Sequence, residues 1–262
     1  MLDIDKVKKV RSKLTKFYDE LSCISLFHSE DIVKSLMQER GYWSEDMYNT
    51  LLDLKVCKVD NLTDIKFLLP HYSYEDFKDF GLVNDNGYFL LSGRYILPIR
   101  DIGGGVIALV GWDKEGGFKK YVTTKTYGFV KDASFFNYDS YKYAWEKYQG
   151  VTFLVEGIFD AVSLRSLGFP VLAVMGTKMG KIKQDMLKRY TKVIAIPDND
   201  KGGQLVTLGY HKSRWEIPVE STFIKLPKGV KDVDDLIKFY DCKYDLEKAI
   251  NSRYIYHIKD EV

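Results

Sequence analysis

Three groups of acidic residues follow apolar runs or begin polar turns. They are Glu156 with Asp160, Asp198 with Asp200, and Asp232 with Asp234. β-Branched runs precede the first two groups and predict strands. Because the carboxyl ends of parallel strands meet at one edge of a sheet, we expect the three groups to lie close together. Carboxylate oxygens are the ligands that Mg²⁺ prefers, and Mg²⁺ keeps waters that a phosphate can displace. The pattern therefore indicates metal-dependent phosphoryl chemistry.

Each group taken alone has a simpler structural explanation. Acidic residues are common at helix N-termini, where they interact with the helix dipole. Asp and Asn followed by glycines are typical of turns. An aspartate before an apolar helix is a common N-cap. The order of the three groups along one series of strands favours a shared site.

Gly157 and Asp160 stand at the point where the first of these strands turns into a helix. Gly157 predicts a close approach of the backbone or an unusual φ angle. Asp160 follows Glu156 by about one helical turn, so both side chains can face the same crevice. We expect Asp160 to support the site rather than to ligate a metal.

Composition places the chain among ordinary soluble globular proteins. Its 262 residues are 45% hydrophobic and 29% charged, with a net charge of +2. These are enough residues for one large or two small domains. No apolar run approaches the ~20 residues that span a membrane, and no export signal begins the chain. We expect a cytoplasmic protein with no membrane partner.

The cysteines Cys23, Cys57 and Cys242 are too scattered for a zinc ribbon, so no zinc is expected.

The first part of the chain, residues 1–150, predicts an α+β subdomain. Residues 1–80 are expected to be helical, and the first helix has a periodic apolar stripe formed by Val7, Val10, Leu14, Phe17, Tyr18 and Leu21. Residues 87–124 predict an antiparallel meander. Its expected strands cover residues 88–91, 95–99 and 106–110, with glycine-rich turns between or after them.

The second part, residues 151–241, alternates strands with helices, which predicts βαβ units and an α/β fold with a parallel sheet. The expected strands are 151–155, 170–175, 192–196 and 220–226. The expected helices are 158–167, 180–190, 203–214 and 233–240, and another helix over 139–149 leads into this part. Residues 242–262 are expected to form a short C-terminal tail.

Basic and aromatic residues gather on or near the meander: Arg94, Arg100, Lys119, Lys120, Lys125 and Tyr121. A run of solvated lysines is often only a surface. With aromatic rings between the cations, these residues can instead bind the phosphates and stack on the bases of a single strand.

The acidic motif Glu156-Gly157-x-x-Asp160, followed further on by Asp198-x-Asp200, resembles the TOPRIM domain of bacterial-type primases, topoisomerases and several nucleases. The resemblance implies a Rossmann-like domain with a mainly parallel sheet. More of the chain is similar to DnaG-like primases. The similar segments are Glu39-Arg40-Gly41, the stretch from Gly93 to Asp101, Lys120-Tyr121-Val122, Met175-Gly176-Thr177, Leu226-Pro227 and the stretch from Lys231 to Asp235.

The resemblance implies a primase core, an enzyme that makes short RNA primers from NTPs on single-stranded DNA by two-metal nucleotidyl transfer. Glu156, Asp198 and Asp200 are then the catalytic residues and hold Mg²⁺ or Mn²⁺, and Asp232 and Asp234 are further metal ligands. Arg94 and Lys120 fall on motif positions and rank first for binding template, nucleotide or the RNA–DNA primer hybrid.

The zinc-binding and helicase modules of the family are not found in the sequence. We therefore expect a replicative helicase or a separate zinc-bearing protein as a partner. By analogy, a core of this kind suggests a phage or mobile-element protein, which would act in the host cytoplasm. A TOPRIM nuclease, a topoisomerase and a non-catalytic DNA-binding relative stay open, and the strand-rich segment 88–130 favours the primase over the nuclease.

Overall fold

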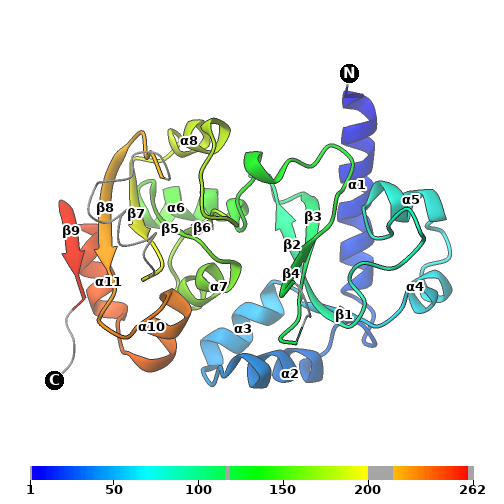
Figure 1. The fold of residues 1–262 in the computed structure, drawn as a ribbon, viewed down its shortest axis with the longest axis horizontal. Coiled ribbons are helices and arrows are strands. Elements are labelled where there is room, and N and C mark those ends of the chain that lie inside the picture. Colours follow the sequence, from blue (N-terminus) through cyan, green and yellow to red (C-terminus); the bar gives the residue numbers. More distant parts are fainter. Residues whose placement is uncertain (1, 116–118, 200–214, 259–262) are drawn as a thin grey trace. The chain divides into compact units, whose positions relative to one another are not determined.

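The computed structural model describes residues 2–115, 119–199 and 215–258. The chain forms two compact units, Met1–Phe129 and Val130–Val262 (Figure 1). In the described part of the chain, every helix is too short or too polar to cross a lipid bilayer.

The first unit contains a four-stranded antiparallel sheet. Its strands, in spatial order, are β1 (Cys57–Val59), β2 (Arg94–Arg100), β3 (Val106–Trp112) and β4 (Tyr121–Thr123). In the turn between β2 and β3, Asp101 Oδ1 accepts hydrogen bonds from the amides of Gly103 (2.9 Å) and Gly105 (3.1 Å). The predicted meander is therefore confirmed for its two longest strands and for the turn that joins them.

The strand predicted over residues 88–91 is wrong. This segment makes one isolated bridge, between Val83 and Phe89, and the edge beside β2 is taken by β1 instead. The reason lies in the turn that follows. Gly93 has a φ of 67°, and its amide donates to the Val59 carbonyl (2.9 Å), so the chain reverses there before β2 begins.

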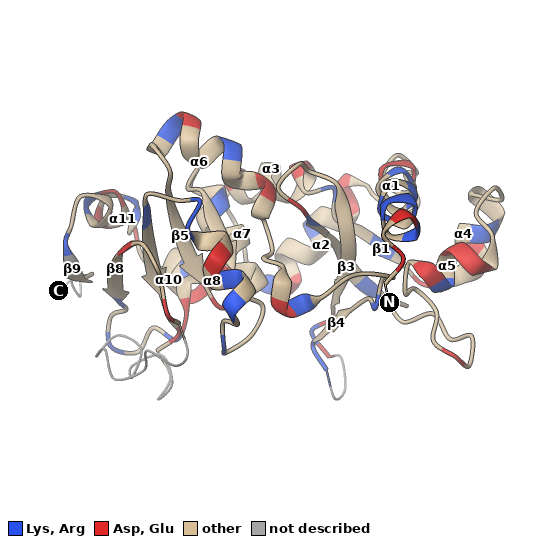
Figure 2. Ribbon diagram, turned by 90° about the horizontal axis from the view of Figure 1, so that it is seen from above, with Lys and Arg blue, Asp and Glu red and all other residues tan. Residues whose placement is uncertain are grey.

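Helices precede and interrupt this sheet. They are α1 (Ile4–Leu21), α2 (Glu30–Arg40), α3 (Glu45–Asp53), α4 (Leu62–Leu68) and α5 (Tyr74–Asp79). The predicted apolar stripe of α1 is buried at all six positions, which its spacing near 3.6 residues explains. Lysines and an arginine occupy much of the rest of α1 (Figure 2).

The second unit contains a parallel sheet, as the sequence predicts. Its strands, in spatial order, are β6 (Val171–Ala173), β5 (Val151–Val155), β7 (Lys192–Ile196), β8 (Glu220–Lys225) and β9 (Tyr254–His257). All neighbouring pairs run in parallel. The bounds of β5 and β7 coincide with the predicted ones.

The helices of this unit are α6 (Tyr141–Tyr148), α7 (Ile158–Ser166), α8 (Lys181–Leu187), α10 (Val233–Phe239) and α11 (Lys243–Ile250), with short 3₁₀ turns η1 (Lys131–Ala133) and η2 (Tyr138–Ser140). Four of them lie where the sequence predicts helices. The helix predicted over residues 203–214 lies outside the described residues.

The sequence predicts a domain boundary at residue 150, whereas in the structure the first unit ends at residue 129. Residues 130–150 belong to the second unit through backbone and side-chain contacts with β6 that no local pattern announces. Phe136 makes an antiparallel bridge with Ala173 of β6, and Asn137 Nδ2 donates to the Val171 carbonyl (2.9 Å). These contacts pair the outer edge of β6.

The expected tail over residues 242–262 contains structure as far as residue 258. α11 follows α10, and β9 pairs with β8 at the edge of the sheet. The buried Lys192 side chain holds this segment, because its Nζ donates to the carbonyls of Ile250 (2.9 Å) and Ser252 (2.6 Å). The prediction of a tail was wrong because β9 pairs with β8 and α11 buries Leu246 and Ala249, contacts with distant segments that no local pattern announces.

Candidate active site

Glu156 and Asp198 lie at the same edge of the parallel sheet. Val155, the last residue of β5, pairs with Ile196, the last residue of β7. Glu156 follows β5 directly, and Asp198 follows β7 after one proline; both residues are half-buried. In open α/β sheets, ligands bind at this carboxyl edge. Asp200, the third predicted catalytic residue, lies outside the described residues.

Asp160 is buried between α7 and α10. Its side chain is held by two backbone amides: Oδ2 accepts from Gly157 (3.0 Å), and Oδ1 accepts from Asp234 (3.0 Å). The first bond belongs to the N-cap of α7. Asp160 therefore fixes the start of α7 and joins it to the start of α10.

The pKa of Asp160 is raised to about 7. Burial is the main cause, because it disfavours the charged form of a carboxyl group. The nearby carboxylates of Asp198 and Asp232 raise the pKa further by repulsion. This repulsion indicates that Asp160, Asp198 and Asp232 lie near one another.

A glycine is required at position 157 because the Asp160 carboxylate occupies the space where a side chain would begin. A Cβ atom at this position would collide with the Asp160 carboxylate, which comes close in order to accept the Gly157 amide. The φ of Gly157 is −96°, which other residues adopt readily. Of the two reasons that the sequence suggests for this glycine, the close approach holds and the unusual φ does not.

Asp232 and Asp234 differ in their surroundings. Asp232 is the N-cap of α10: its side chain accepts from the Asp235 amide (2.9 Å) and forms an ion pair with Lys231 (3.1 Å). Its side chain is 16% exposed, so it can reach a ligand at the sheet edge. Oδ1 bonds the amide and Oδ2 pairs with Lys231, whose side chain is 75% exposed, so a metal role would require only the displacement of this exposed lysine.

Asp234 is 4% exposed and links two helices. Its Oδ1 accepts from Ser163 Oγ of α7 (2.6 Å), and its Oδ2 accepts from Lys238 Nζ of α10 (2.7 Å). Both oxygens therefore have protein partners. Before Asp234 could bind a metal ion, at least one of these interactions would have to break.

Asn199 has a role that the sequence interpretation missed. Its amide donates to the Lys231 carbonyl (2.6 Å), and its Nδ2 donates to the carbonyls of Pro227 (3.2 Å) and Val230 (3.0 Å). The loop after β7 is thereby tied to the loop before α10. Asp-Asn-Asp looked like a turn, and only the contacts with a distant loop give its middle residue this second purpose.

The predicted donors have the chemistry of a hard divalent cation site, since all of them are carboxylates. The repulsion that raises the pKa of Asp160 is the kind of repulsion that a bound cation relieves. Among residues 2–115, 119–199 and 215–258, no three His, Cys, Asp or Glu side chains are grouped so that they could hold a metal ion. The predicted site therefore depends on Asp200, and the metal assignment stays a prediction.

In the first unit, the two predicted arginines have structural partners. Arg94 lies across Gly111, and its Nη1 donates to the carbonyls of Lys119 (3.1 Å) and Lys120 (3.3 Å). Arg100 Nη1 donates to the Gly104 carbonyl (2.8 Å) in the turn after β2. Both arginines thus stabilise turns or strand ends of the meander.

The side chains of the predicted lysines reach solvent. Lys119, Lys120 and Lys125 are exposed, and Tyr121 on β4 is 39% exposed. This arrangement suits sequence-independent contact with a charged polymer, and template binding by these residues stays a prediction.

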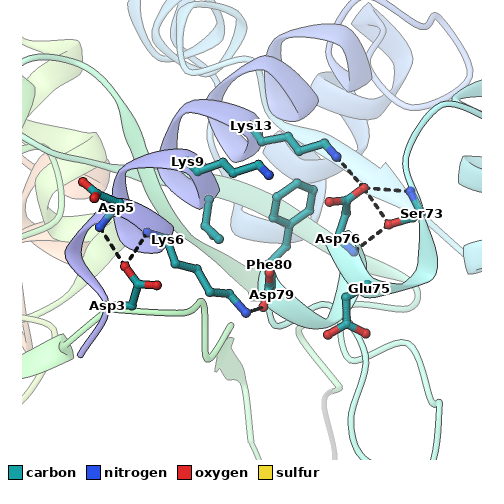
Figure 3. Close-up of a pocket in the computed structure, with 11 residues that line it drawn as sticks. Asp3, Asp5, Lys6, Lys9, Lys13, Ser73, Glu75, Asp76, Asp79 and Phe80 are labelled. Carbon is teal, nitrogen blue, oxygen red and sulfur yellow. Dashed lines mark hydrogen bonds and ion pairs between the residues drawn. The ribbon is translucent and has the colours of Figure 1, made fainter. Parts of the chain in front are cut away.

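A cavity of about 510 Å³ in the first unit lies apart from all of these residues (Figure 3). It separates α1 from α5 and is bridged by the ion pairs Lys6–Asp79 (2.8 Å) and Lys13–Asp76 (2.7 Å). Its lining includes five carboxylates and three lysines. The excess of carboxylates argues against a phosphate site, and the ion pairs explain the charges by helix packing.

Residues 153–237 match a protein family described as Toprim-like. The matched segment runs from β5 to α10 and includes Glu156, Asp160, Asp198 and Asp232. It is the part of the second unit in which the acidic groups were predicted to meet.

Similarity to curated proteins extends beyond this segment. A DNA primase of Clostridium acetobutylicum is 31% identical over 154 residues, which are 58% of this chain and 25% of that protein. The chain spans about a quarter to a third of the length of the curated relatives that it matches.

Solved structures resemble nearly the whole chain. The zinc-binding and RNA polymerase domains of the Aquifex aeolicus primase match 96% of this chain and 63% of that one, with a TM-score of 0.75 and 26% identity. The DnaG primase catalytic domain bound to ssDNA matches 94% of this chain and 78% of that one, with a TM-score of 0.70 and 20% identity, which shows the fold alone. The resemblance that the sequence motifs predicted is therefore confirmed: the chain carries a Toprim-like domain and has the fold of a DnaG-type primase core.

Proposed function

We propose that this chain is the catalytic core of a DNA primase, which joins NTPs into a short RNA primer on a single-stranded DNA template. One observation carries the proposal. Glu156 and Asp198 follow paired parallel strands, and burial together with repulsion from Asp198 and Asp232 raises the pKa of the nearby Asp160 to about 7. Clustered carboxylates of this kind are suited to a divalent cation at a site of phosphoryl transfer.

In this proposal, Glu156, Asp198 and Asp200 hold Mg²⁺ or Mn²⁺, with Asp232 beside them. A bound ion supplies activation of the attacking 3′-hydroxyl and stabilisation of the leaving pyrophosphate. Asp160 holds the Gly157 amide, directly after Glu156, and the Asp234 amide, two residues after Asp232.

The exposed lysines near β4 are proposed to bind the phosphates of the template. Lys119, Lys120 and Lys125 supply positive charge, and Tyr121 supplies a ring on which a base can stack. A similar catalytic domain that binds ssDNA supports this assignment. Arg94 and Arg100 are proposed to act mainly by shaping the strand ends from which these side chains extend.

A metal-dependent nuclease is the second candidate, because the same carboxylates suit hydrolysis of phosphodiesters. The primase is favoured because the similarity to primase cores covers both units, including the antiparallel sheet of the first. A non-catalytic relative is disfavoured by the repelling carboxylates, which a bound cation would stabilise.

The deciding experiment offers labelled NTPs, a single-stranded DNA template and either Mg²⁺ or Mn²⁺. We expect the chain to extend an annealed RNA primer, and we expect chelation of the metal to stop the reaction. An Asp198→Asn preparation run in parallel excludes a contaminating polymerase. Cleavage of labelled DNA without incorporation would establish the nuclease instead. Adding a replicative helicase or a zinc-bearing primase domain tests the proposed partners, since either should raise initiation more than extension.

A further inference from the structure

Lys183 of α8 is a charged residue in an unusual place. It is 2% exposed and is among the largest fully buried side chains of the described chain. Its Nζ donates to the Val174 carbonyl and lies 5.5 Å from the centroid of the Phe135 ring. Burial lowers the pKa of Lys183 to about 8. Burial of an ammonium group costs free energy unless the group is paired and hydrogen-bonded, so the position of Lys183 needs an explanation.

The carbonyl that accepts from Lys183 belongs to a strained turn. Met175, the next residue, has a φ of 58°, a left-handed conformation that residues other than glycine seldom adopt. Such a conformation persists only where the surrounding structure holds it in place. Here two groups hold it: the Lys183 ammonium on one side and the end of β5 on the other.

The contacts with β5 lead to the predicted site. The Val174 amide donates to the Val155 carbonyl (2.9 Å), and the Met175 amide donates to the Glu156 carbonyl (3.0 Å). The strained turn thus extends the pairing between β6 and β5 by one residue, up to the backbone of Glu156. Two hydrogen bonds, joined by the Val174–Met175 peptide group, connect the buried lysine with the backbone of the residue that is proposed to hold the metal.

We propose that Lys183 is a positioning residue for Glu156: its ammonium fixes the Val174–Met175 turn, and the turn fixes the backbone that carries the Glu156 carboxylate. The inference rests on the proposed metal role of Glu156. Without Lys183, Met175 can relax toward an ordinary backbone conformation, and the hydrogen bond to the Glu156 carbonyl is lost or lengthened. Outer partners that orient metal ligands commonly change metal affinity by ~10–100-fold.

The second unit contains a matched control. Lys192 is 7% exposed and also donates to backbone carbonyls, those of Ile250 and Ser252. It begins β7, whereas Asp198 follows the end of that strand, so Lys192 lies at the opposite edge of the sheet from the predicted site. Lys183→Met and Lys192→Met each remove one buried ammonium from carbonyl acceptors.

The test measures Mn²⁺ binding by the full chain with electron paramagnetic resonance, the Mg²⁺ concentration for half-maximal primer extension, and thermal stability. We expect both variants to melt at lower temperature than the wild type. Lys183→Met should weaken Mn²⁺ binding and raise the half-saturating Mg²⁺ concentration by about tenfold or more. Lys192→Met should leave both metal readouts within about twofold of the wild type, the scatter expected of independent sites.

Two further variants keep the result decisive. Lys183→Gln keeps a donor and removes the charge, so it remains testable if Lys183→Met does not fold, and it should fall between the wild type and Lys183→Met. Met175→Gly in the Lys183→Met background removes the left-handed strain and should recover part of the metal affinity while stability stays low. A folded Lys183 variant with wild-type metal binding, or equal metal effects at Lys183 and Lys192, would overturn the proposal. Glu156→Gln separates the two ideas: if it leaves metal binding unchanged, the metal site itself is wrong.

Discussion

The acidic residues of the second unit and the basic residues of the first are held in opposite ways. Asp160, Asp232 and Asp234 each accept hydrogen bonds from backbone amides or buried side chains. The side chains of Lys119 and Lys120 are exposed. Arg94 binds the backbone carbonyls of these two lysines and not their ammonium groups.

The difference follows from what each charge must do. Carboxylates that bind a metal ion have to be placed before the ion arrives, because misplacement by a fraction of an ångström weakens the site. Lysines that contact a flexible polymer gain from mobility, because the phosphates of any sequence have to be reached. Substitutions in the acidic group should therefore have large effects on chemistry, and substitutions in the basic group should have small effects on affinity.

The largest effect is expected from the carboxylates at the carboxyl edge of the sheet. Glu156→Gln and Asp198→Asn each take one charge from the proposed metal site at nearly constant volume. Loss of several kcal/mol of transition-state stabilisation corresponds to a decrease of about 10³-fold in primer extension. Circular dichroism should show an unchanged fold.

The control is Asp185→Asn on α8, which removes an exposed carboxylate that pairs with Lys188 (2.7 Å). We expect activity within about twofold of the wild type for this surface change. Equal activities of Asp198→Asn and Asp185→Asn would end the assignment of Asp198 as a metal ligand.

Asp234 tests whether a fixed carboxylate serves the fold or the metal. Its oxygens accept from Ser163 and from Lys238, whose side chain is 15% exposed. Asp234→Ala removes the carboxylate that pairs with the largely buried Lys238 ammonium, and removal of one member of a buried ion pair typically costs about 3–5 kcal/mol of unfolding free energy. Urea denaturation of the purified chain measures the change.

Asp235→Ala is the neighbouring control, since the Asp235 amide that bonds Asp232 remains in the variant. We expect a loss of less than ~1 kcal/mol there, within the range of ordinary surface substitutions. Comparable losses at Asp234 and Asp235 would contradict the structural role of Asp234 and return it to the list of candidate metal ligands.

Much of this arrangement could be predicted from sequence, and the reasons are local. The β-branched runs of β5 and β7 gave correct strand bounds, and the helical spacing of α1 gave its buried face. The short strand β1 was missed because three residues of mixed character carry no periodic pattern. Residues 88–91 were apolar enough for a strand, but the turn at Gly93 prevented pairing beside β2.

The sequence could not show how the site is supported. No local pattern marks Lys183 or Lys192 as buried, because their burial depends on carbonyl groups of other segments. Asn199 looked like a turn residue for the same reason. Motif spacing identified residues that could do chemistry, whereas the groups that position them became visible only in three dimensions.

Metal binding should couple to stability in the second unit and not in the first. An ion that binds only the folded chain raises the free energy of unfolding by about 2.7 kcal/mol when free Mg²⁺ is 100 times its Kd. Relief of the repulsion among Asp160, Asp198 and Asp232 is the physical reason. Urea denaturation with and without Mg²⁺ measures the gain, and Asp198→Asn should abolish it. A gain that survives in Asp198→Asn would place the ion elsewhere.

Lys183 gives a pH signature. Its folded-state pKa of about 8 lies below the ordinary lysine value of 10.5, so between these values the unfolded chain binds more protons than the folded chain. The contribution of Lys183 to the free energy of unfolding therefore rises with pH across that window. The neighbouring charges of Asp132 and Lys131 act in opposite directions on it.

We expect the wild type to gain about 1–3 kcal/mol of unfolding free energy relative to Lys183→Met between pH 7.5 and pH 10, since each pKa unit is worth about 1.4 kcal/mol. Paired urea titrations at several pH values within that range measure the difference. A constant difference across the range would show that Lys183 is not buried as described.

The smallest effect is expected at the exposed lysines. Lys120→Ala should weaken binding of single-stranded DNA by a few-fold at low salt and should reduce the slope of log K against log salt by about 0.7, because each phosphate contact on a single strand releases condensed counterions. Fluorescence anisotropy with a labelled oligonucleotide at several salt concentrations measures both.

Arg94→Ala is the informative comparison. Its guanidinium donates to the carbonyls of Lys119 and Lys120, so its loss should loosen the backbone and weaken binding with a smaller change of slope. If Arg94→Ala lowers the slope as much as Lys120→Ala does, Arg94 contacts phosphate directly, and the distinction between fixed and mobile charge fails at this position.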